Sequence, residues 1–459
     1  MRMMPRKRIC LGLIVLTFAP AWAQEGSSAP QPVPAYGMDS SADTPETTGD
    51  RMMTPPPVSG QTYPIAFTSE ERSNYLRGGM TFTSAYTDNA VGAVNGHPVS
   101  DISYSVAPSL ALDGTTPRSH LLLTYAPGFT FYQRTSSRNE ADQNGAVEFE
   151  CRLSPHVTFS ARDAVQRSSN VLNQPDPASS SEVSGAAQGA DFSVEAPVAD
   201  RLSNFGNLGL TYQFSLNSMI GAGGTFTNLH YPNQAQVPGL FDSSSQAGLA
   251  FYSLRVSKIN YFGATYQYQR LLSYPTGGIS ETQTHAAFLF YTVYPTPRLS
   301  ISLFGGPQYS DSVLPALVSP AREWTPAAGA SMSWQGQSNS FALSYLRTIA
   351  GGGGLPQAVH LDSVNASVRQ RIVKSLSGSV VGAYAQNDFL GSVGQGVSNG
   401  HTVSGTATLQ QQFGQHVNLQ LGYTRLHQDY SGVAVISSVP NTSREFVAIS
   451  YQFAAALGR

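Results

Sequence analysis

The residues best suited to hydrolytic chemistry are a histidine, a carboxylate and a hydroxyl that are close in sequence, His360, Asp362 and Ser363. A catalytic histidine needs an orienting acid and a nucleophile or water, all within hydrogen-bond reach. Sequence spacing alone does not place side chains within that reach, and the 9 histidines are scattered along the chain. A hydrolase is therefore kept only as an alternative, and we predict no catalytic residue and no enzyme.

Other site types lack the residues that they need. No group of His, Cys and acidic residues has the spacing of a metal site, and the sequence predicts neither a metal nor a cofactor. The glycine run from Gly351 to Gly354 lacks the Lys and the Ser or Thr of a phosphate-binding loop. With 26 basic against 28 acidic residues, the formal net charge is −2, so nothing indicates nucleic acid binding.

A different, electrostatic role is open to arginines and glutamates that recur in stretches of alternating polarity. Between residues 147 and 153, the odd positions hold Val, Phe, Cys and Leu, and the even positions hold Glu, Glu and Arg. A charge at every second residue excludes a buried helix and fits a strand with one polar and one apolar face. Ser154 and Pro155 then lead into a second alternating stretch, so the sequence predicts a hairpin here.

Segments of this kind, about ten residues each, recur from Asn74 to Phe453, and their connections are short and long in turn. Strands tilted by about 45° need about 9 to 11 residues to cross the hydrocarbon of a membrane. Because lipid cannot satisfy an open sheet edge, such a sheet must close. The predicted fold is all-β: a transmembrane antiparallel up-and-down β-barrel of about 18 strands (16 to 20 possible), with short periplasmic turns and long external loops.

The N-terminal part of the chain indicates which membrane is crossed. Basic residues precede an apolar run from Ile9 to Phe18, and Ala21-Trp22-Ala23 provides the small residues that a signal peptidase recognises. Residues 1–23 are therefore predicted to be a signal peptide for the Sec pathway, cleaved near Ala23, and the destination is the cell outer membrane. Residues 24–72, rich in Pro, Ser and Thr, are predicted to be a disordered periplasmic leader, and residues 73–459 the barrel.

The residues Tyr86-Thr87-Asp88-Asn89-Ala90, at the end of the first expected strand, carry a resemblance. They are similar to the Tyr-x-Asp-Asn element of β-barrel porins associated with exopolysaccharide loci, and nearly the whole mature chain resembles bacterial outer-membrane porin-type barrels. The resemblance implies a diffusion pore of unassigned substrate. One departure is that Tyr451-Gln452-Phe453 is followed by Ala454 to Arg459, whereas such chains commonly end on an aromatic residue. We therefore expect the barrel-assembly machinery to recognise an internal signal.

If the apolar parity faces lipid, the charged residues of the other parity face the inside of the barrel, the lumen. A barrel of this size encloses an aqueous space, and charges there set a field for passing ions. The sequence thus predicts a weakly cationic wall formed by Arg77, Arg152, Arg162, Arg255, Arg369 and Arg371, opposed by Glu148 and Glu150. For Glu148, Arg152 and Arg162 the alternative is an ion-pair cluster that braces neighbouring strands.

The third external loop, from Arg167 to Ser203, is the longest and carries five acidic residues. In trimeric general porins the third loop folds into the lumen and faces arginines of the wall. By analogy, the candidates for a constriction are Asp176, Glu182, Asp191, Glu195 and Asp200. The alternative is a loop that stays outside, where long Ser- and Ala-rich loops usually lie.

The predicted function is passive diffusion of small hydrophilic solutes through an outer-membrane channel. One alternative is a non-conducting scaffold or surface protein linked to polysaccharide export. Stacking on sugar rings would require aromatic residues in the lumen. The inward set offers few, chiefly Tyr132, Phe251, Phe304 and Phe446, so a dedicated sugar path is not indicated.

The expected partners are outer-membrane lipid, lipopolysaccharide, the assembly machinery and small hydrophilic solutes or ions. Arg270 and Arg347 have outward parity next to long loops, so we expect them to reach the lipopolysaccharide headgroups. A homotrimer would need a flat stripe of small residues on the outer wall. Ala328, Ala330 and Gly405 are suggestive of such a stripe, and the oligomeric state is left open.

Overall fold

The computed structural model describes residues 74–90, 98–168, 200–296, 298–313, 321–390, 399–430 and 441–456. The predicted signal peptide and leader lie outside these ranges and stay predictions. Within them, helical structure is confined to the single 3-10 turns η1 (Ser136–Arg138) and η3 (Gln234–Gln236). No helix among these residues has the length and apolar character needed to span a membrane.

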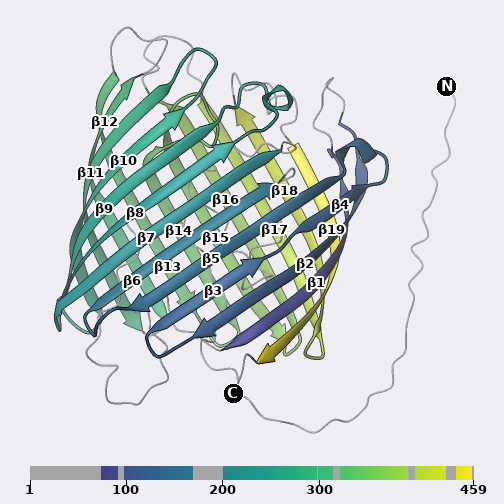
Figure 1. Cartoon of the computed structure of the whole chain (residues 1–459), viewed down its shortest axis with the longest axis horizontal. Coiled ribbons are helices and arrows are strands. Elements are labelled where there is room, and N and C mark those ends of the chain that lie inside the picture. Colours follow the sequence, from purple (N-terminus) through teal and green to yellow (C-terminus); the bar gives the residue numbers. More distant parts are fainter. Residues whose placement is uncertain are drawn as a thin grey trace. The chain divides into compact units, whose positions relative to one another are not determined.

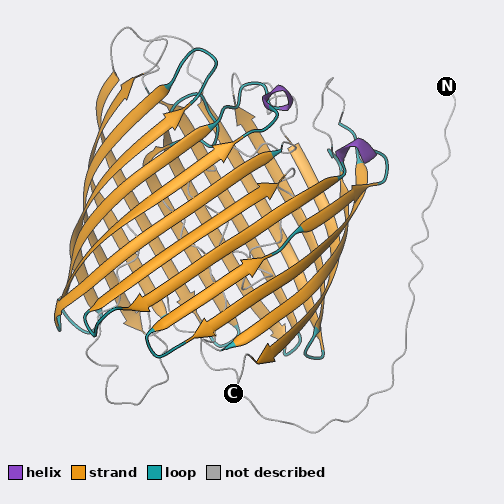
Figure 2. Cartoon of the chain, in the orientation of Figure 1, coloured by secondary structure: helices purple, strands orange, loops and turns teal. Residues whose placement is uncertain are grey.

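The strands follow one another along the chain as β1 (Tyr75–Thr87), β2 (Asp101–Thr115), β3 (Ser119–Tyr125), β4 (Gly128–Tyr132), β5 (Glu140–Arg152), β6 (Val157–Ser168), β7 (Arg201–Ser215), β8 (Ser218–His230), β9 (Ser243–Arg255), β10 (Asn260–Ser273), β11 (Ser280–Thr296), β12 (Leu299–Val313), β13 (Ala321–Gln335), β14 (Asn339–Ala350), β15 (Val359–Val373), β16 (Leu376–Phe389), β17 (Asn399–Phe413), β18 (Val417–Tyr430) and β19 (Asn441–Ala456). They form one antiparallel sheet, and the pairing of β19 with β1 closes it into a barrel (Figure 1; Figure 2). The predicted fold is confirmed.

One crossing is broken at a proline. Leu110 of β2 pairs with Tyr125 of β3, and Val106 of β2 pairs with Phe129 of β4, so the register along β2 is unchanged. Because proline has no N–H to donate to a ladder, Pro127 interrupts the strand between these pairs. The 19 strand segments therefore make 18 crossings, the number predicted from the sequence.

The connections alternate in length as predicted. Residues 216–217 join β7 to β8, and residues 414–416 join β17 to β18. Gly414 has a φ of 67°, a left-handed conformation that glycine adopts without a Cβ clash, which lets this short turn close. The intervening connections are longer, for example residues 231–242 between β8 and β9 and residues 351–358 between β14 and β15. The short turns gather at one end of the barrel and the long loops at the other (Figure 1).

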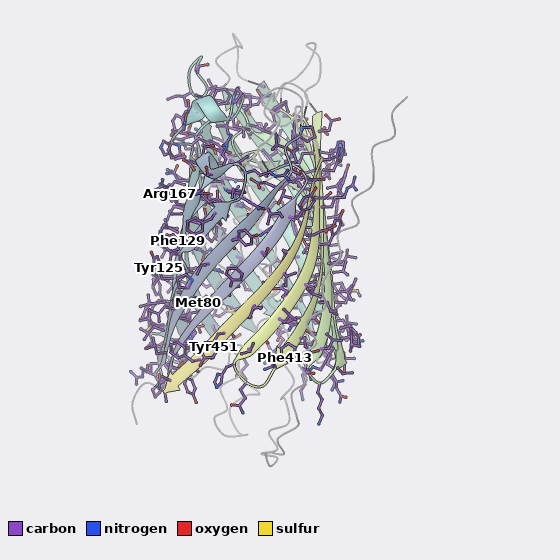
Figure 3. All side chains as sticks on the ribbon, turned by 90° about the vertical axis from the view of Figure 1, so that its right-hand side faces the viewer. Met80, Tyr125, Phe129, Arg167, Phe413 and Tyr451 are labelled. Atoms are coloured by element: carbon purple, nitrogen blue, oxygen red, sulfur yellow. The ribbon has the colours of Figure 1, made fainter. Side chains whose placement is uncertain are left out.

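The two faces of the wall separate by parity. Phe82 of β1 pairs with Val106 of β2 and Ile449 of β19, and these side chains share the apolar outer face. Met80 and Tyr451 are 55% and 50% exposed, and both stand on the outer surface with other labelled apolar side chains (Figure 3). In a closed barrel the ladder satisfies the backbone, so an apolar outer face can lie in hydrocarbon. This barrel is built to span a membrane.

On the inner face, aromatic rings lie over glycines of the neighbouring strand. A Cβ on Gly263 would lie 2.3 Å from the ring of Phe290, and a Cβ on Gly422 would lie 2.1 Å from the ring of Phe446. Without a Cβ at these positions, each ring can lie flat against the sheet and cover an otherwise bare strand. Aromatic-glycine pairs of this kind fix the position of inward-facing rings on the wall.

We expect Gly263→Ala to destabilise the folded barrel by about 1–3 kcal/mol, the usual cost of overpacking. The new Cβ would lie 2.1 Å from the backbone oxygen of Tyr252, which cannot move as freely as a side chain. The matched control is Gly248→Ala on β9, where a Cβ meets nothing within 4 Å. Urea unfolding in lipid vesicles measures the stability of both variants. Equal unfolding midpoints would mean that close packing around Gly263 does not contribute to the stability of the barrel.

Candidate permeation path

The predicted wall residues all lie on the face opposite to the lipid-facing set. Glu148 and Glu150 alternate with Val147, which is 42% exposed on the outer face. Arg369 and Arg371 alternate in the same way with exposed apolar residues of β15. By the same parity the inward face also holds Arg77, Arg152, Arg162 and Arg255. Most of these residues lie toward the short-turn ends of their strands, on β1, β5, β6, β9 and β15.

The register brings some of these charges together. Glu148 of β5 is the cross-strand partner of Arg162 of β6. The ion pairs among the described residues do not include one between them. Arg255 instead donates a hydrogen bond from Nε to Oδ1 of Asn217 in the turn before β8, at 3.0 Å. The alternative interpretation, an ion-pair cluster that braces neighbouring strands, is therefore not supported by a contact between Glu148 and Arg162.

A charged cluster that the sequence did not reveal lies beside Arg77. Asp113 has Oδ2 at 3.9 Å from Nη2 of Arg77, and its Oδ1 lies 3.0 Å from Nε2 of His120. Asp113 and His120 are both buried, at 4% and 7% exposure. They flank the short turn between β2 and β3 with the same inward parity, which is the signal that could have found them. Asp113 offsets the charge of Arg77 in the lumen.

Two of the predicted inward arginines, Arg369 and Arg371, lie together on β15. Arg371 is exposed and Arg369 is half-buried, near the short-turn end of that strand. The acidic pair Glu148 and Glu150 is on β5, which lies about half-way around the closed ring. Opposite charges on facing walls create a field across the lumen, and water-exposed groups retain it with little desolvation cost.

The predicted constriction loop lies almost wholly outside the described residues, as do Asp176, Glu182, Asp191 and Glu195. Asp200 is described and is half-buried immediately before β7. A constriction made by that loop therefore stays a prediction.

Two other loops cover the external end of the lumen. Residues of the β8–β9 loop and the β14–β15 loop pack with strand ends of the far wall in one buried apolar group, here called the loop cluster: Leu229, Tyr231, Val237, Leu240, Leu355, Val359 and Tyr430. Tyr430 ends β18, which lies about half-way around the ring from β8 and β9. Loops that reach across this distance must lie over or inside the mouth of the barrel.

Hydrogen bonds hold the two loops to each other and to the wall. The amide of Phe241 donates to the carbonyl of Gly354 at 2.7 Å, and the hydroxyl of Tyr231 donates to the carbonyl of Gly353 at 3.3 Å. Ser273 of β10 donates from Oγ to the carbonyl of Leu355 at 2.8 Å. Burial raises the pKa of the Tyr231 hydroxyl to about 12, in keeping with a dry environment. The loop cluster is a packed structure with defined contacts.

The glycine run from Gly351 to Gly354 determines the backbone conformation of the β14–β15 loop. Gly352, Gly353 and Gly354 have φ angles of 71°, 66° and 102°, a region that other residues rarely adopt. A Cβ on Gly354 would lie 2.9 Å from the ring of Tyr231. These glycines let the β14–β15 loop turn back against the β8–β9 loop.

More aromatic residues face inward than the sequence indicated. The run from 282 to 293 has weak parity because apolar residues follow one another, and the structure turns Phe288 and Phe290 inward and Leu289 outward. Tyr261 and Tyr294 also face inward, with ring centroids 5.8 Å apart. However, Phe288 and Phe290 are only 4% and 3% exposed, so they offer no open face on which a sugar could stack.

The residues considered for hydrolysis do not form a catalytic group. Asp362 accepts a hydrogen bond from the hydroxyl of Tyr345 at 2.8 Å, and Nε2 of His360 lies 3.4 Å from Oε2 of Glu323. Ser363 is buried with the inward parity of β15, whereas Asp362 shares the outward face with Tyr345. In the described part of the chain, no cluster of His, Cys and acidic residues could hold a metal ion.

No protein-family model matches the chain, and no curated protein matches it. Among solved structures, the chain is similar to Pseudomonas aeruginosa OpdL, with a TM-score of 0.41, 10% identity, and coverage of 83% of this chain and 98% of that one. For Acinetobacter baumannii OccAB4 the TM-score is 0.41 and the identity 9%, over 84% of this chain and 100% of that one. Similarity this low says nothing about substrate.

The barrel's own features assign its location. A closed antiparallel barrel with an apolar outer face, short turns at one end and long loops at the other is the architecture of bacterial outer-membrane proteins. Arg270 and Arg347 face outward near the long loops and pair with Glu281 at 2.8 Å and Asp362 at 4.0 Å. The protein is an outer-membrane β-barrel whose apolar outer wall faces lipid.

Proposed function

We propose that this barrel is a channel for the passive diffusion of small hydrophilic solutes, with a weakly cationic wall. The observation that carries the proposal is the inward face toward the short turns, where Arg369, Arg371 and the facing glutamates line an 18-crossing barrel. Only barrels of about eight strands fill themselves with side chains, so this one encloses space for water. Charged groups on such a wall are typical of ion and solute paths.

The loop cluster sets how wide this path is. Inward-facing residues toward the external end are buried, as for Val359 at 0%, Leu361 at 5% and Ser363 at 6%, whereas Arg371 on the same strand is exposed. We infer that the external half is the narrow part and that passage is limited to small solutes. The five acidic residues of the third external loop remain candidates for a further constriction there.

A non-conducting scaffold linked to polysaccharide export is the second candidate function. The loop cluster favours it, because a mouth closed by packed apolar side chains would block diffusion. A homotrimer and recognition by the assembly machinery remain proposals under either function. A hydrolase has no supporting constellation among the described residues.

Liposome swelling separates these functions. Vesicles that contain the refolded mature barrel are diluted into isosmotic solutions of arabinose, glucose, sucrose or an amino acid. A channel admits the smaller solutes, so the vesicles swell at rates that fall with solute size. A scaffold leaves them unswollen, and this result, obtained with barrel that migrates as folded on unheated gels, would reject diffusion.

A further inference from the structure

The hydrogen-bonded ladder between β13 and β14 ends before either strand does. It runs from the pair of Gln335 and Ser340 to the pair of Ala328 and Arg347. Beyond that pair β13 extends over residues 321–327 and β14 over residues 348–350. The flanking ladders, β12–β13 and β14–β15, continue to the external ends of these strands. The wall therefore separates at its external end between β13 and β14.

The end of β14 bends into the lumen. Ile349 has the parity of Tyr345, which is 38% exposed on the outer face, yet Ile349 is only 1% exposed. It packs with the inward-facing Leu271 of β10 in a buried group that includes Leu390. Its amide also donates at 3.3 Å to Oε1 of Gln308, an inward side chain of β12. A residue still on the outer face of β14 could not make these contacts.

A proline lies at the point of separation. Continuing the same register would place Thr348 opposite Ala327 and Ile349 opposite Pro326. Proline cannot donate to a ladder, so the paired arrangement would be weakened at this position. Pro326 is itself the cross-strand partner of Pro307 in β12. The sequence thus weakens β13 as a partner at the place where β14 departs.

A side-chain contact spans the separation. Nε2 of His360, on β15, lies 3.4 Å from Oε2 of Glu323, on β13. These strands are not neighbours in the ladder, because β14 lies between them in the ring. The contact forms because the end of β14 has left the wall. Returning β14 to the wall would place its backbone between these two side chains.

We propose that residues 348–358 are a gate, closed in this structure, that opens when the end of β14 pairs with β13 again. The proposal rests on the channel function proposed above and adds its regulation. In the closed state Ile349 is buried, and the carbonyl of Gly354 accepts a hydrogen bond from the amide of Phe241, so the β14–β15 loop covers the lumen. In the open state residues 348–350 leave the lumen and rejoin the wall, and they move the β14–β15 loop away from the mouth of the barrel. Such two-state elements are a common basis of gating.

A disulfide that joins the separated strands tests the gate. In a Cys151→Ser background, which removes the cysteine of the barrel, the variant Ala327→Cys/Thr348→Cys is oxidised with copper phenanthroline in a planar bilayer. We expect a several-fold rise in mean conductance that dithiothreitol reverses. The matched control is Ser331→Cys/Ser344→Cys, a pair already joined by the ladder, where oxidation should leave conductance unchanged.

A second variant opens the gate without a covalent bond. Pro326→Val restores a backbone donor at the separation, so the open fraction should rise about two- to tenfold, the effect of one hydrogen bond. Pro307→Val is the control, because this residue is the partner of Pro326 in β12, away from the β13–β14 separation. It should leave gating unchanged.

The possible outcomes are distinct. If the Ala327–Thr348 disulfide is confirmed by mass spectrometry and conductance stays constant, the gate is rejected. If the disulfide fails to form while the control pair forms one, the two strands never meet, and the gate is again rejected. If no variant conducts, including one in which residues 351–357 are deleted, the barrel is not a channel and the proposed function is rejected.

Discussion

Removing the β14–β15 loop is expected to raise the single-channel conductance several-fold. The change replaces residues 351–357 by a Gly-Ser link between Ala350 and Ala358. It deletes Leu355 from the loop cluster and the hydrogen bonds that Gly353 and Gly354 accept. Conductance follows the narrowest cross-section of a water-filled pore, so clearing the external half lets the wider, charged half determine the current. Single-channel recordings in symmetric potassium chloride measure the conductance of the deletion variant and of the unchanged barrel.

The control for this deletion is a shortening of the β10–β11 loop at residues 275–278, none of which belongs to the loop cluster. It should change conductance little, because it leaves the contacts between the two covering loops in place. An unchanged conductance after loss of residues 351–357, with the barrel still folded, would mean that another segment forms the narrowest point.

Neutralising both arginines of β15 is expected to shift ion preference toward cations. Coulomb's law gives about 0.4 kcal/mol for a unit charge 10 Å from an ion in water. Two such charges change the local anion concentration about fourfold at low salt, and less as salt screens them. We therefore expect Arg369→Gln/Arg371→Gln to move the reversal potential in a salt gradient, with a larger shift at low ionic strength.

Arg322 supplies the matched control for this experiment. Its side chain is 64% exposed on the outer face, where Nε pairs with Oδ2 of Asp311 at 3.2 Å. Arg322→Gln removes a positive charge from the protein without changing the wall of the lumen. Equal shifts for this variant and the β15 variant would show that net charge, and not the inward face, sets the preference.

The fold was predictable because its signal is local. Alternation with a period of 2 assigns each side chain to a face, and this pattern alone is enough to put Glu148, Glu150, Arg369 and Arg371 on the inner face. The signal failed where it was weak. From Phe288 to Tyr291 every residue is apolar, so parity there could be resolved only by the pairing of β11 with β10 and β12.

The contents of the lumen were not predictable in the same way. The sequence offered the long third loop as a candidate constriction, and this stays a prediction because residues 169–199 lie outside the described ranges. The described loops that cover the mouth are two shorter ones. From the sequence, the run from Gly351 to Gly354 was only excluded as a phosphate-binding loop. Its position is defined by contacts with Tyr231 and Phe241, which are more than a hundred residues away. Such tertiary contacts have no local pattern.

A single-channel recording of the refolded mature barrel, with the reversal potential taken in a salt gradient, shows directly whether the barrel conducts ions and which ions it prefers. A channel with a covered mouth and a cationic wall on β15 predicts discrete, small conductance steps with anion preference. A bilayer that stays silent with properly folded protein, before and after removal of residues 351–357, would contradict the channel and favour the scaffold.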